Sequence, residues 1–265
     1  DLPISDIPLN FGGYRKSRYP SFRNIMETIL ILHGWGSRAE NWNRVKELLE
    51  NRGYNVLAPD MPGFGKNPPP QRPWTTEDYS EWVKDFCEKQ NFSQFFLLGH
   101  SFGGGLAVKF ASRFPEKIKG LILVAPKIRR QKNYRYCLGL ISAKLGKIIF
   151  SIPIFSFFRP LARRVLYAVI GTRDYYKLEI QKAVIMKETF KEIVGEELIS
   201  YLPRIKTPTL IVWGEKDDMT PVKDAHLINK MIKGSKLEVI KKGEHALNLQ
   251  FPEILAEKIL NFIND

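Results

Sequence analysis

The sequence predicts an α/β fold with a mostly parallel central sheet and helices on both faces. Short apolar runs of strand length alternate with amphipathic stretches of helical spacing, a pattern typical of such sheets. Several of the apolar runs end in glycine-containing turns that also carry residues suited to chemistry. The chain has 265 residues and is 44% hydrophobic, so it can bury a large core as one enzyme-sized unit.

The alternation begins after residue 27 and is clear up to residue 90. Residues 1–27 receive no assigned element, because glycine and proline signals break any alternation there. Apolar residues at helical spacing before Gly53, and acidic residues after Thr75, mark two helices. In chain order, we expect a strand at 29–32, a helix at 41–52, a strand at 54–59 and a helix at 76–90.

One long helical segment interrupts the alternation in the second half of the chain. Residues 127–206 have helical periodicity, many aromatic side chains and no strand–turn pattern, so we expect a separate helical layer there. Around it we expect strands at 95–98, 121–124, 208–213 and 237–240, and helices from 103, at 221–232 and at 251–263.

The pentapeptide Gly99-His100-Ser101-Phe102-Gly103 stands between a predicted strand and a predicted helix. Strand, sharp turn and helix around G-x-S-x-G form the setting of a nucleophile elbow. Such a turn strains the serine backbone, and a Cβ at either flanking glycine would collide with the strand or helix packed behind. The strain lifts the hydroxyl out of the sheet, next to the N–H groups of the helix N-terminus. Ser101 is therefore the predicted nucleophile.

Three further turns follow predicted strands, where the partners of a serine nucleophile are needed. In His33-Gly34-Trp35-Gly36, the Trp35 N–H would pair with the Phe102 N–H as an oxyanion hole. Asp217 and Asp218 follow a later strand, and His245 follows the last one. The chain order of the candidate groups is thus Ser, Asp, His.

These motifs, in this order, resemble the α/β-hydrolase superfamily in the branch that carries a helical cap. The resemblance spans residues 28–263 and includes the D-x-x-G-x-G loop Asp60-Met61-Pro62-Gly63-Phe64-Gly65. It implies an α/β-hydrolase fold with a core of residues 1–126 and 207–265. It also implies a helical cap, residues 127–206, inserted after the strand that follows the nucleophile-elbow helix.

The general base can be chosen by elimination among four histidines. His33 belongs to the oxyanion turn, His100 adjoins the nucleophile and should point the other way, and His226 falls within a predicted helix. His245 alone lies in a loop after the last strand, beside a glycine that lets the loop bend. His245 is the predicted base that accepts the Ser101 proton.

The acid that orients this imidazole must come from the loop after Trp213, because no acidic residue occurs between Glu116 and Asp174. Asp217 and Asp218 compete there. In the superfamily the acid is usually the third residue after the strand-ending glycine, which favours Asp217 and leaves Asp218 as the alternative. The resemblance also implies that Gly34, Trp35, His100 and Phe102 border the substrate pocket.

The predicted activity is hydrolysis of carboxylic esters through an acyl-enzyme on Ser101, with an apolar acyl part in a small-molecule substrate. A carbon–carbon bond hydrolase or a lactonase would use the same triad. A non-catalytic receptor or scaffold is disfavoured, because every catalytic position holds the right residue type. Members that hydrolyse haloalkanes or epoxides carry an aspartate at the elbow, so Ser101 excludes both. The sequence contains no ligand cluster that would imply a metal or organic cofactor.

The positive charge is concentrated in the predicted cap. Residues 127–206 contain 17 basic and 6 acidic residues, a net of +11 in a chain whose formal charge is +13. Prolines and arginines interrupt the apolar run 145–171, so it does not predict a transmembrane helix. This segment would either contact an anionic membrane surface or line the acyl pocket with a solvated basic outer face. No nucleic-acid-binding motif accompanies the charge, and the oligomeric state is not indicated.

The two cysteines, Cys87 and Cys137, are too few for a disulfide framework and predict reduced thiols. No signal-like segment precedes the first predicted strand. Together these observations favour a cytoplasmic location.

Overall fold

The computed structural model describes residues 26–91, 93–129 and 180–265. The described residues up to 129 and those from 185 onward belong to one compact unit. Residues 180–184 belong to a second unit, whose remainder lies outside the described residues. Most of the predicted cap (residues 130–179 of 127–206), Cys137 and residues 1–25 likewise lie outside the described part.

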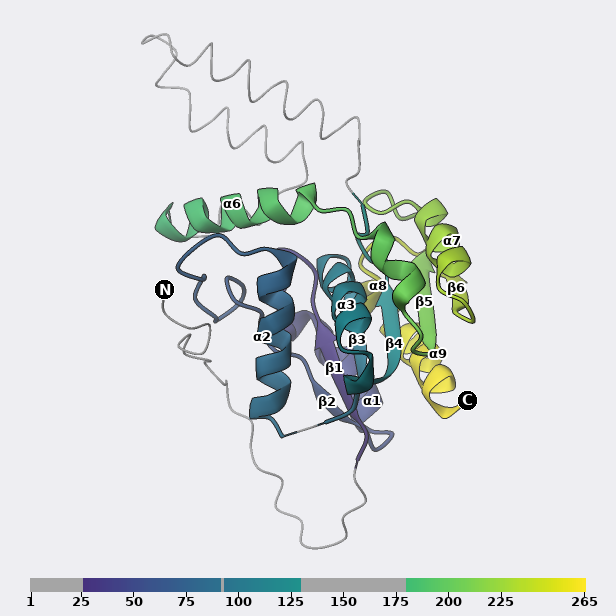
Figure 1. Cartoon of the computed structure of the whole chain (residues 1–265). Helices are drawn as coiled ribbons and strands as arrows, with labels where there is room; N and C mark the ends of the chain where they lie inside the picture. Colours follow the sequence, from purple (N-terminus) through teal and green to yellow (C-terminus); the bar gives the residue numbers. More distant parts are fainter. Residues whose placement is uncertain (1–25, 92, 130–179) are drawn as a thin grey trace, which may run out of the picture. The chain divides into compact units, whose positions relative to one another are not determined.

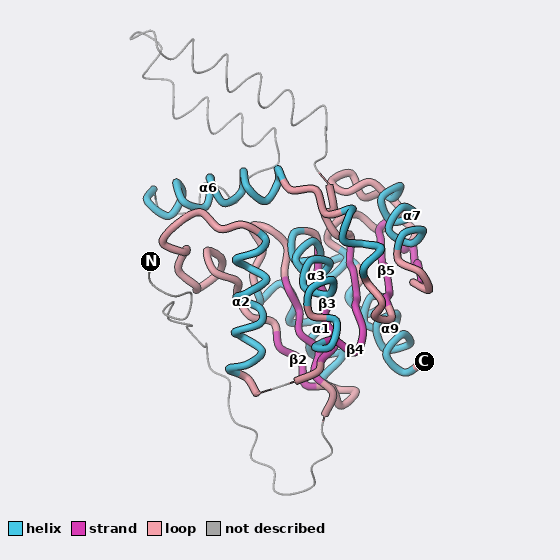
Figure 2. The backbone as a smooth tube through the Cα atoms, in the orientation of Figure 1, coloured by secondary structure: helices cyan, strands magenta, loops and turns pink. Residues whose placement is uncertain are grey.

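A six-stranded sheet of order β2-β1-β3-β4-β5-β6 forms the centre of the first unit (Figures 1 and 2). Every strand pair is parallel, which confirms the predicted parallel sheet. Because the chain leaves β1 outward to β2 and then returns to the other side with β3, the order reverses between β1 and β3. Such reversals are where ligands bind in open α/β sheets. The strands are Thr28–Leu32 (β1), Asn55–Leu57 (β2), Phe95–His100 (β3), Ile118–Val124 (β4), Thr209–Gly214 (β5) and Lys236–Ile240 (β6).

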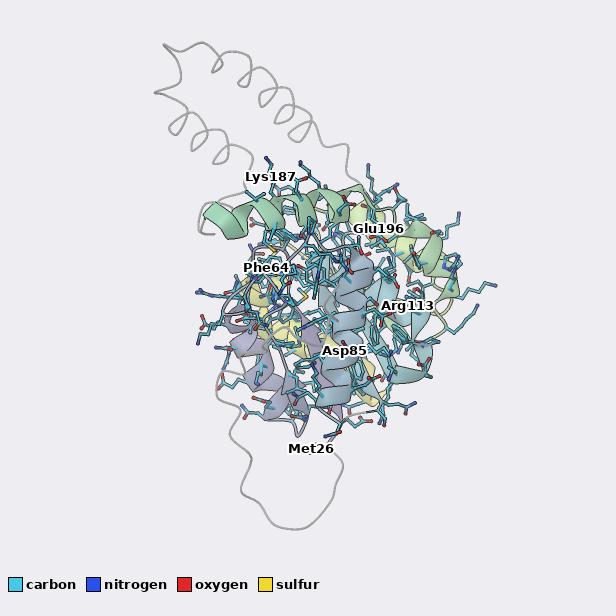
Figure 3. The ribbon with its side chains drawn as sticks, turned by 60° about the vertical axis from the view of Figure 1, so that its left-hand side comes forward. Met26, Phe64, Asp85, Arg113, Lys187 and Glu196 are labelled. Atoms are coloured by element: carbon cyan, nitrogen blue, oxygen red, sulfur yellow. The ribbon has the colours of Figure 1, made fainter. Side chains whose placement is uncertain are left out.

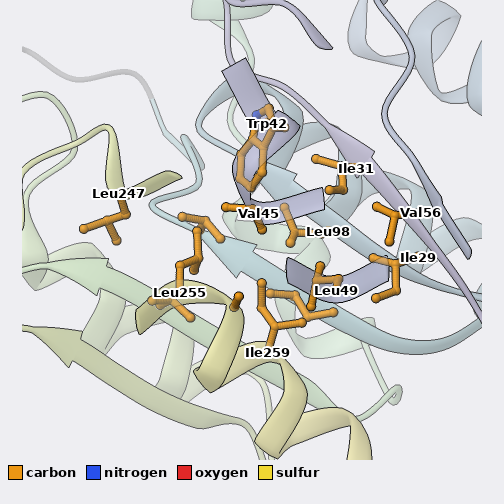
Figure 4. Close-up of a cluster of buried hydrophobic side chains, with 14 of the residues drawn as sticks. Ile29, Ile31, Trp42, Val45, Leu49, Val56, Leu98, Leu247, Leu255 and Ile259 are labelled. Carbon is orange, nitrogen blue, oxygen red and sulfur yellow. The ribbon is translucent and has the colours of Figure 1, made fainter. Parts of the chain in front are cut away.

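One face of the sheet packs against helices from the beginning and the end of the described sequence. Helix α1 (Asn43–Glu50) and helix α9 (Pro252–Asn264) lie side by side there, with the short α8 (Leu247–Gln250) between the β6 loop and α9. Alternate residues of the strands supply the apolar surface, as the two-residue period of a strand requires. Figure 4 shows this cluster, which includes Ile29, Ile31, Val45, Leu49, Leu98, Leu255 and Ile259.

The opposite face is covered by α2 (Thr76–Lys89), α3 (Phe102–Arg113) and α7 (Val222–Met231). Helix α2 begins with a capping box, in which the Thr75 hydroxyl accepts from the Asp78 N–H and the Asp78 carboxylate accepts from the Thr75 N–H. This arrangement satisfies N–H groups that lack intrahelical acceptors, so the helix start agrees with the predicted one.

The two stretches of chain on either side of residues 130–195 lie side by side at Ile128 and Leu198, and we call these two points the crossings. The Leu198 N–H donates to the Ile128 carbonyl at 2.7 Å. Between them in sequence lies α6 (Ile180–Gly195), whose residues from 185 onward belong to the first unit. There the Trp74 N–H donates to the Thr189 hydroxyl at 3.0 Å. A short 3-10 helix, Ile199–Arg204, follows and packs on α3.

An ion pair with one buried partner holds each crossing. Arg129 binds the buried Asp224 carboxylate of α7, with Nε 3.0 Å from Oδ1. Glu196, labelled in Figure 3 at the end of α6, accepts from the Lys109 ammonium of α3 at 2.7 Å. Lys109 also contacts the Thr76 hydroxyl at 3.0 Å and a Glu77 oxygen at 3.2 Å. We call Lys109, Thr76, Glu77 and Glu196 the Lys109 cluster.

The structure contains details that the sequence did not predict. The segment 41–52 divides into a 3-10 turn, Ala39–Trp42, and α1. Helix α8 was not expected. Strand β3 ends two residues later than predicted, β4 begins three residues earlier, and β5 is shifted by one residue toward the C-terminus. Cys87 is a buried free cysteine on α2, and burial raises the pKa of its thiol to about 12. Among the described helices, none is long and apolar enough to cross a membrane.

Candidate active site

Ser101 lies in a strained turn between β3 and α3. Its backbone has φ 53° and ψ −114°, a conformation that L residues rarely adopt. A Cβ on Gly99 would lie 2.3 Å from the Gly103 carbonyl oxygen, and one on Gly103 would lie 2.2 Å from the Leu32 oxygen. The backbone of β1, β3 and α3 therefore leaves room only for glycine on either side of the serine. The turn has the geometry that the G-x-S-x-G motif predicts.

The turn after β1 lies directly against Ser101. A Cβ on Gly34 would be 3.4 Å from the Ser101 Cβ. The Gly34 carbonyl accepts two hydrogen bonds, from the His33 Nδ1–H at 2.8 Å and from the Ser37 N–H at 3.1 Å. Because the peptide is planar and trans, fixing this carbonyl also fixes the direction of the Trp35 N–H.

His33 holds this turn as a neutral ring. Its Nε2 accepts from the Met61 N–H at 3.0 Å, so the ring proton sits on Nδ1, where it donates to Gly34. Burial lowers the pKa of His33, and the hydrogen bond to Gly34 only partly offsets that effect. A neutral His33 thus ties the first turn to the loop after β2.

The Trp35 and Phe102 N–H groups are open to an incoming atom. Within the described residues, neither donates to a backbone carbonyl. Phe102 is the first residue of α3, so its N–H has no intrahelical acceptor and lies at the positive end of the helix dipole. Two such donors beside one serine can stabilise an oxyanion.

The buried Asp217 and the partly buried His245 form a hydrogen-bonded pair at the carboxyl ends of β5 and β6. Their Oδ2 and Nδ1 atoms are 2.8 Å apart, and the Asp217 side chain is fully buried. The His245 loop passes closely over the end of β5, where a Cβ on Gly214 would lie 2.4 Å from the Glu244 oxygen. Burial opposes ionisation of Asp217, but hydrogen bonds from His245 and from Thr220 outweigh it and lower the carboxyl pKa.

Thr220 is a site residue that sequence reasoning missed. Its hydroxyl donates to Asp217 Oδ2 at 2.8 Å, and its N–H donates to Oδ1 at 2.8 Å. The Met219 N–H adds a third hydrogen bond to this carboxylate, again to Oδ1, at 2.9 Å. An aspartate followed three residues later by threonine and then proline indicates a side-chain-capped turn, a signal that could have identified Thr220.

The remaining candidates occupy other places. Asp218 and His226 have exposed side chains, and it is Asp217 that contacts the His245 ring. Asp60 binds backbone instead: its carboxylate accepts from the Ala39 N–H at 2.7 Å and from the Lys66 N–H at 3.0 Å. A Cβ on Gly65 would overlap this carboxylate, so Asp60 shapes its own loop.

His100 points its ring toward the His245 loop and is only 7% exposed. Its Nε2 lies 3.0 Å from the His245 carbonyl oxygen, and the two rings are 4.9 Å apart. The predicted role of His100 as a pocket residue stays a prediction.

An aromatic cluster adjoins the candidate oxyanion donors. The Trp35 ring lies 4.9 Å from Phe64, 5.4 Å from Phe102 and 5.1 Å from Phe190 of α6. Trp35 and Phe190 are only partly buried, whereas Phe64 and Phe102 are buried. We call these four residues the aromatic wall. Across the residues that the structure describes, no group of three or more His, Cys, Asp or Glu side chains could hold a metal ion.

Comparison with known proteins gives a consistent result. The family model of the alpha/beta hydrolase fold matches residues 27–147. Human serine hydrolase BPHL is 28% identical over 230 residues, covering 85% of this chain and 75% of its own. Lipase 1 of Psychrobacter immobilis is 26% identical over 244 residues, covering 88% and 75%. Among solved structures, the alpha/beta hydrolase MGS-M2, from a deep-sea metagenome library, superposes with a TM-score of 0.72 at 20% identity. It covers 93% of this chain and 92% of its own.

Proposed function

Because the chain belongs to the α/β-hydrolase superfamily, we propose that it is a serine hydrolase that cleaves carboxylic esters. In this proposal Ser101 is the nucleophile, His245 the general base and Asp217 the acid that orients the base. Trp35 and Phe102 supply the oxyanion hole through their N–H groups.

The observation that carries the proposal is the Asp217–His245 hydrogen bond beside the strained Ser101 turn. Asp217 occupies Nδ1 of the imidazole, so the lone pair of a neutral His245 lies on Nε2. Among the described residues, Nε2 has no hydrogen-bond partner, which leaves it able to accept the serine proton. An aspartate that accepts several hydrogen bonds stays ionised and holds the ring in this tautomer.

The first half of the reaction forms the acyl-enzyme. Ser101 Oγ attacks the ester carbonyl carbon while its proton passes to His245 Nε2. The carbonyl oxygen becomes an oxyanion that accepts from the Trp35 and Phe102 N–H groups. The tetrahedral intermediate collapses, the bond to the alkoxy oxygen breaks, and His245 returns its proton to the departing alcohol.

The second half releases the acid. A water molecule gives a proton to His245 Nε2 and attacks the acyl carbon, which forms a second tetrahedral intermediate. When the bond to Ser101 Oγ breaks, His245 returns the proton to the serine. Ester and water are consumed and acid and alcohol are formed, so no cofactor is required for the balance.

The aromatic wall supports an apolar acyl part in the substrate. Partly exposed Trp35 and Phe190 rings next to the oxyanion donors offer apolar surface at the place where the acyl chain would start. The similarity to lipase 1 points in the same direction.

A fluorophosphonate probe tests the nucleophile. It should label the protein once, on Ser101, and Ser101→Ala should lose labelling and lower ester turnover by a factor on the order of 10⁶. Ser112→Ala, the same change on helix α3, is the matched control and should leave both unchanged. Labelling of the Ser101→Ala variant, or its full activity, would contradict the proposal.

A substrate panel tests the bond that is cleaved. We expect p-nitrophenyl esters to be hydrolysed, with kcat/KM rising as the acyl chain lengthens from acetate. Lactones and a ring-cleavage dienoate belong in the same panel. A clear preference for either would replace the ester proposal with a lactonase or a carbon–carbon bond hydrolase.

A further inference from the structure

His100 is the last residue of β3 and directly precedes Ser101, yet its side chain reaches the loop after β6. We propose that His100 is a positioning residue that fixes the His245 loop and thereby sets the base against the nucleophile. The inference rests on the proposed serine hydrolase function and adds a residue to it.

The contact between His100 and His245 joins the ends of two strands that are not neighbours in the sheet. Strands β4 and β5 separate β3 from β6, so the His245 loop must fold back over their ends to reach His100. The His100 ring makes the connection, because its Nε2–H donates to the His245 carbonyl at 3.0 Å. One residue thus joins the nucleophile's own strand to the main chain of the base.

The same ring also adjoins the other two parts of the site. A Cβ on Gly34 would lie 3.0 Å from His100 Nδ1, so the oxyanion turn passes against the ring with no space to spare. The buried Trp42 ring packs on it at 5.9 Å. His100 therefore has little freedom to turn, and the hydrogen bond to His245 has a fixed direction.

The protonation state follows from these contacts. To donate to a carbonyl, Nε2 must carry the proton, which leaves Nδ1 with a lone pair. Nδ1 is buried and has no hydrogen-bond partner among the described residues. A proton placed there would be buried and unpaired, so the ring stays neutral. Burial first, and then the neighbouring His245, lower the pKa of His100 to about 3.

Neutrality suits a residue next to the base. During the proposed reaction His245 becomes positively charged, and a cationic neighbour 4.9 Å away would oppose that step. A neutral donor can hold the His245 backbone without this penalty. Lys or Arg could donate to the same carbonyl but would bring the charge.

The test compares His100→Gln, which keeps an N–H donor, with His100→Met, which has a similar length and no donor. We measure kcat and KM for p-nitrophenyl acetate, the pH profile of kcat, and the melting temperature. His100→Met should lower kcat by about 10- to 100-fold with KM changed far less, because the base is misplaced. It should also displace the acidic limb of the pH profile, and His100→Gln should recover most of the loss.

His226→Gln and His226→Met, at an exposed histidine of α7, are matched controls and should behave as wild type. If His100→Met does not fold, His100→Phe replaces it, since its ring fills the imidazole volume. Imidazole ¹⁵N NMR of the unaltered protein gives an independent reading: His100 should keep a protonated Nε2 and a bare Nδ1 from pH 5 to 8.

The outcomes separate the two proposals. If wild type is neither labelled at Ser101 nor active on esters, the proposed function fails. If wild type is labelled and active but folded His100→Met retains its kcat and pH profile, the positioning role alone is overturned. Equal losses in the Met and Gln variants, or a protonated Nδ1 by NMR, would overturn it as well.

Discussion

A buried ionisable group lies near each end of helix α3, and the two sites make different use of burial. Near its N-terminus, Asp217 and His245 meet at 2.8 Å beside Ser101. Toward its C-terminus, Lys109 and Glu196 meet at 2.7 Å in the Lys109 cluster. By distance and burial alone, the two pairs are nearly indistinguishable.

They differ in whether every donor and acceptor is occupied. The Lys109 ammonium has three protons and three oxygen neighbours, in Thr76, Glu77 and Glu196, and the Tyr201 ring lies 5.5 Å away. His245 uses only Nδ1 among the described residues, and its carbonyl is bound by His100, the residue before the strained Ser101. A buried charge is therefore a weak sign of catalysis, whereas a buried pair with one unfilled valence beside a nucleophile is a stronger one.

The largest expected effect separates the two pairs by activity. Asp217→Asn should lower kcat by about 10⁴-fold, because an amide would favour the wrong tautomer of His245. The melting temperature should change by only a few degrees, so that the loss of kcat cannot be explained by unfolding. Asp218→Asn, at the exposed neighbour, is the control and should cost little. If Asp218→Asn proves the more damaging change, the acid has been assigned to the wrong residue.

The Lys109 cluster should respond in the opposite way. Lys109→Met leaves the partly buried Glu196 with only the Thr76 hydroxyl as a partner, while Glu77 keeps Arg113, and we expect a loss of about 2 kcal/mol in the free energy of unfolding. Urea denaturation measures this loss, and kcat of the folded variant should stay near that of wild type. Lys191→Met, at an exposed lysine of α6, is the matched control. A large fall in kcat without loss of stability would show that the cluster takes part in catalysis.

The free energy of unfolding should also decrease at opposite ends of the pH scale, at alkaline pH because of Lys109 and at acidic pH because of His100. Burial disfavours the Lys109 charge, but Glu196 and Glu77 outweigh it and raise the pKa of Lys109. Its contribution is therefore complete below the unfolded value near 10.4 and is lost as pH rises through the folded value. Lys109→Met should flatten the alkaline fall in stability.

His100 should cause the corresponding loss of stability at acidic pH. Its folded pKa of about 3 lies below the ordinary value near 6.5, so the unfolded chain binds more protons between these values. Stability should fall with decreasing pH across that window, by up to about 1.4 kcal/mol per pH unit from this group. His100→Gln should reduce the slope in urea denaturation at pH 4 to 6. An unchanged slope would mean that His100 is protonated in the folded protein.

The smallest effect concerns Thr220. Thr220→Val removes the hydroxyl bond to Asp217 but keeps the N–H bond, so we expect about 1 kcal/mol, or a several-fold fall in kcat. Thr220→Ser should restore the rate, since it keeps the hydroxyl. If valine matches wild type, the N–H groups of Met219 and Thr220 suffice to hold the carboxylate.

Sequence reasoning succeeded where the relevant signal is local. The strand-length apolar runs, and the close approach of Gly99 to Gly103 across the Ser101 turn, reflect contacts made within a few residues or along one strand. It failed where a contact depends on how distant segments meet. Lys109 lies 87 residues from Glu196, and His100 lies 145 residues from His245. No periodicity or spacing encodes such pairs, because the sheet order and the path of each loop decide them.

The side-by-side crossings at Ile128 and Leu198 have a consequence for how this chain can vary. The Leu198 nitrogen and the Ile128 carbonyl oxygen are held 2.7 Å apart by a hydrogen bond, and ion pairs anchor the neighbouring residues Arg129 and Glu196. The free energy of closing a segment of chain between two fixed ends changes slowly with its length, by about 0.6 kcal/mol for each doubling. Insertions and deletions between these points should therefore cost the rest of the molecule little entropy. The residues beyond the crossings can diverge in length and composition while Ser101, Asp217 and His245 keep their frame.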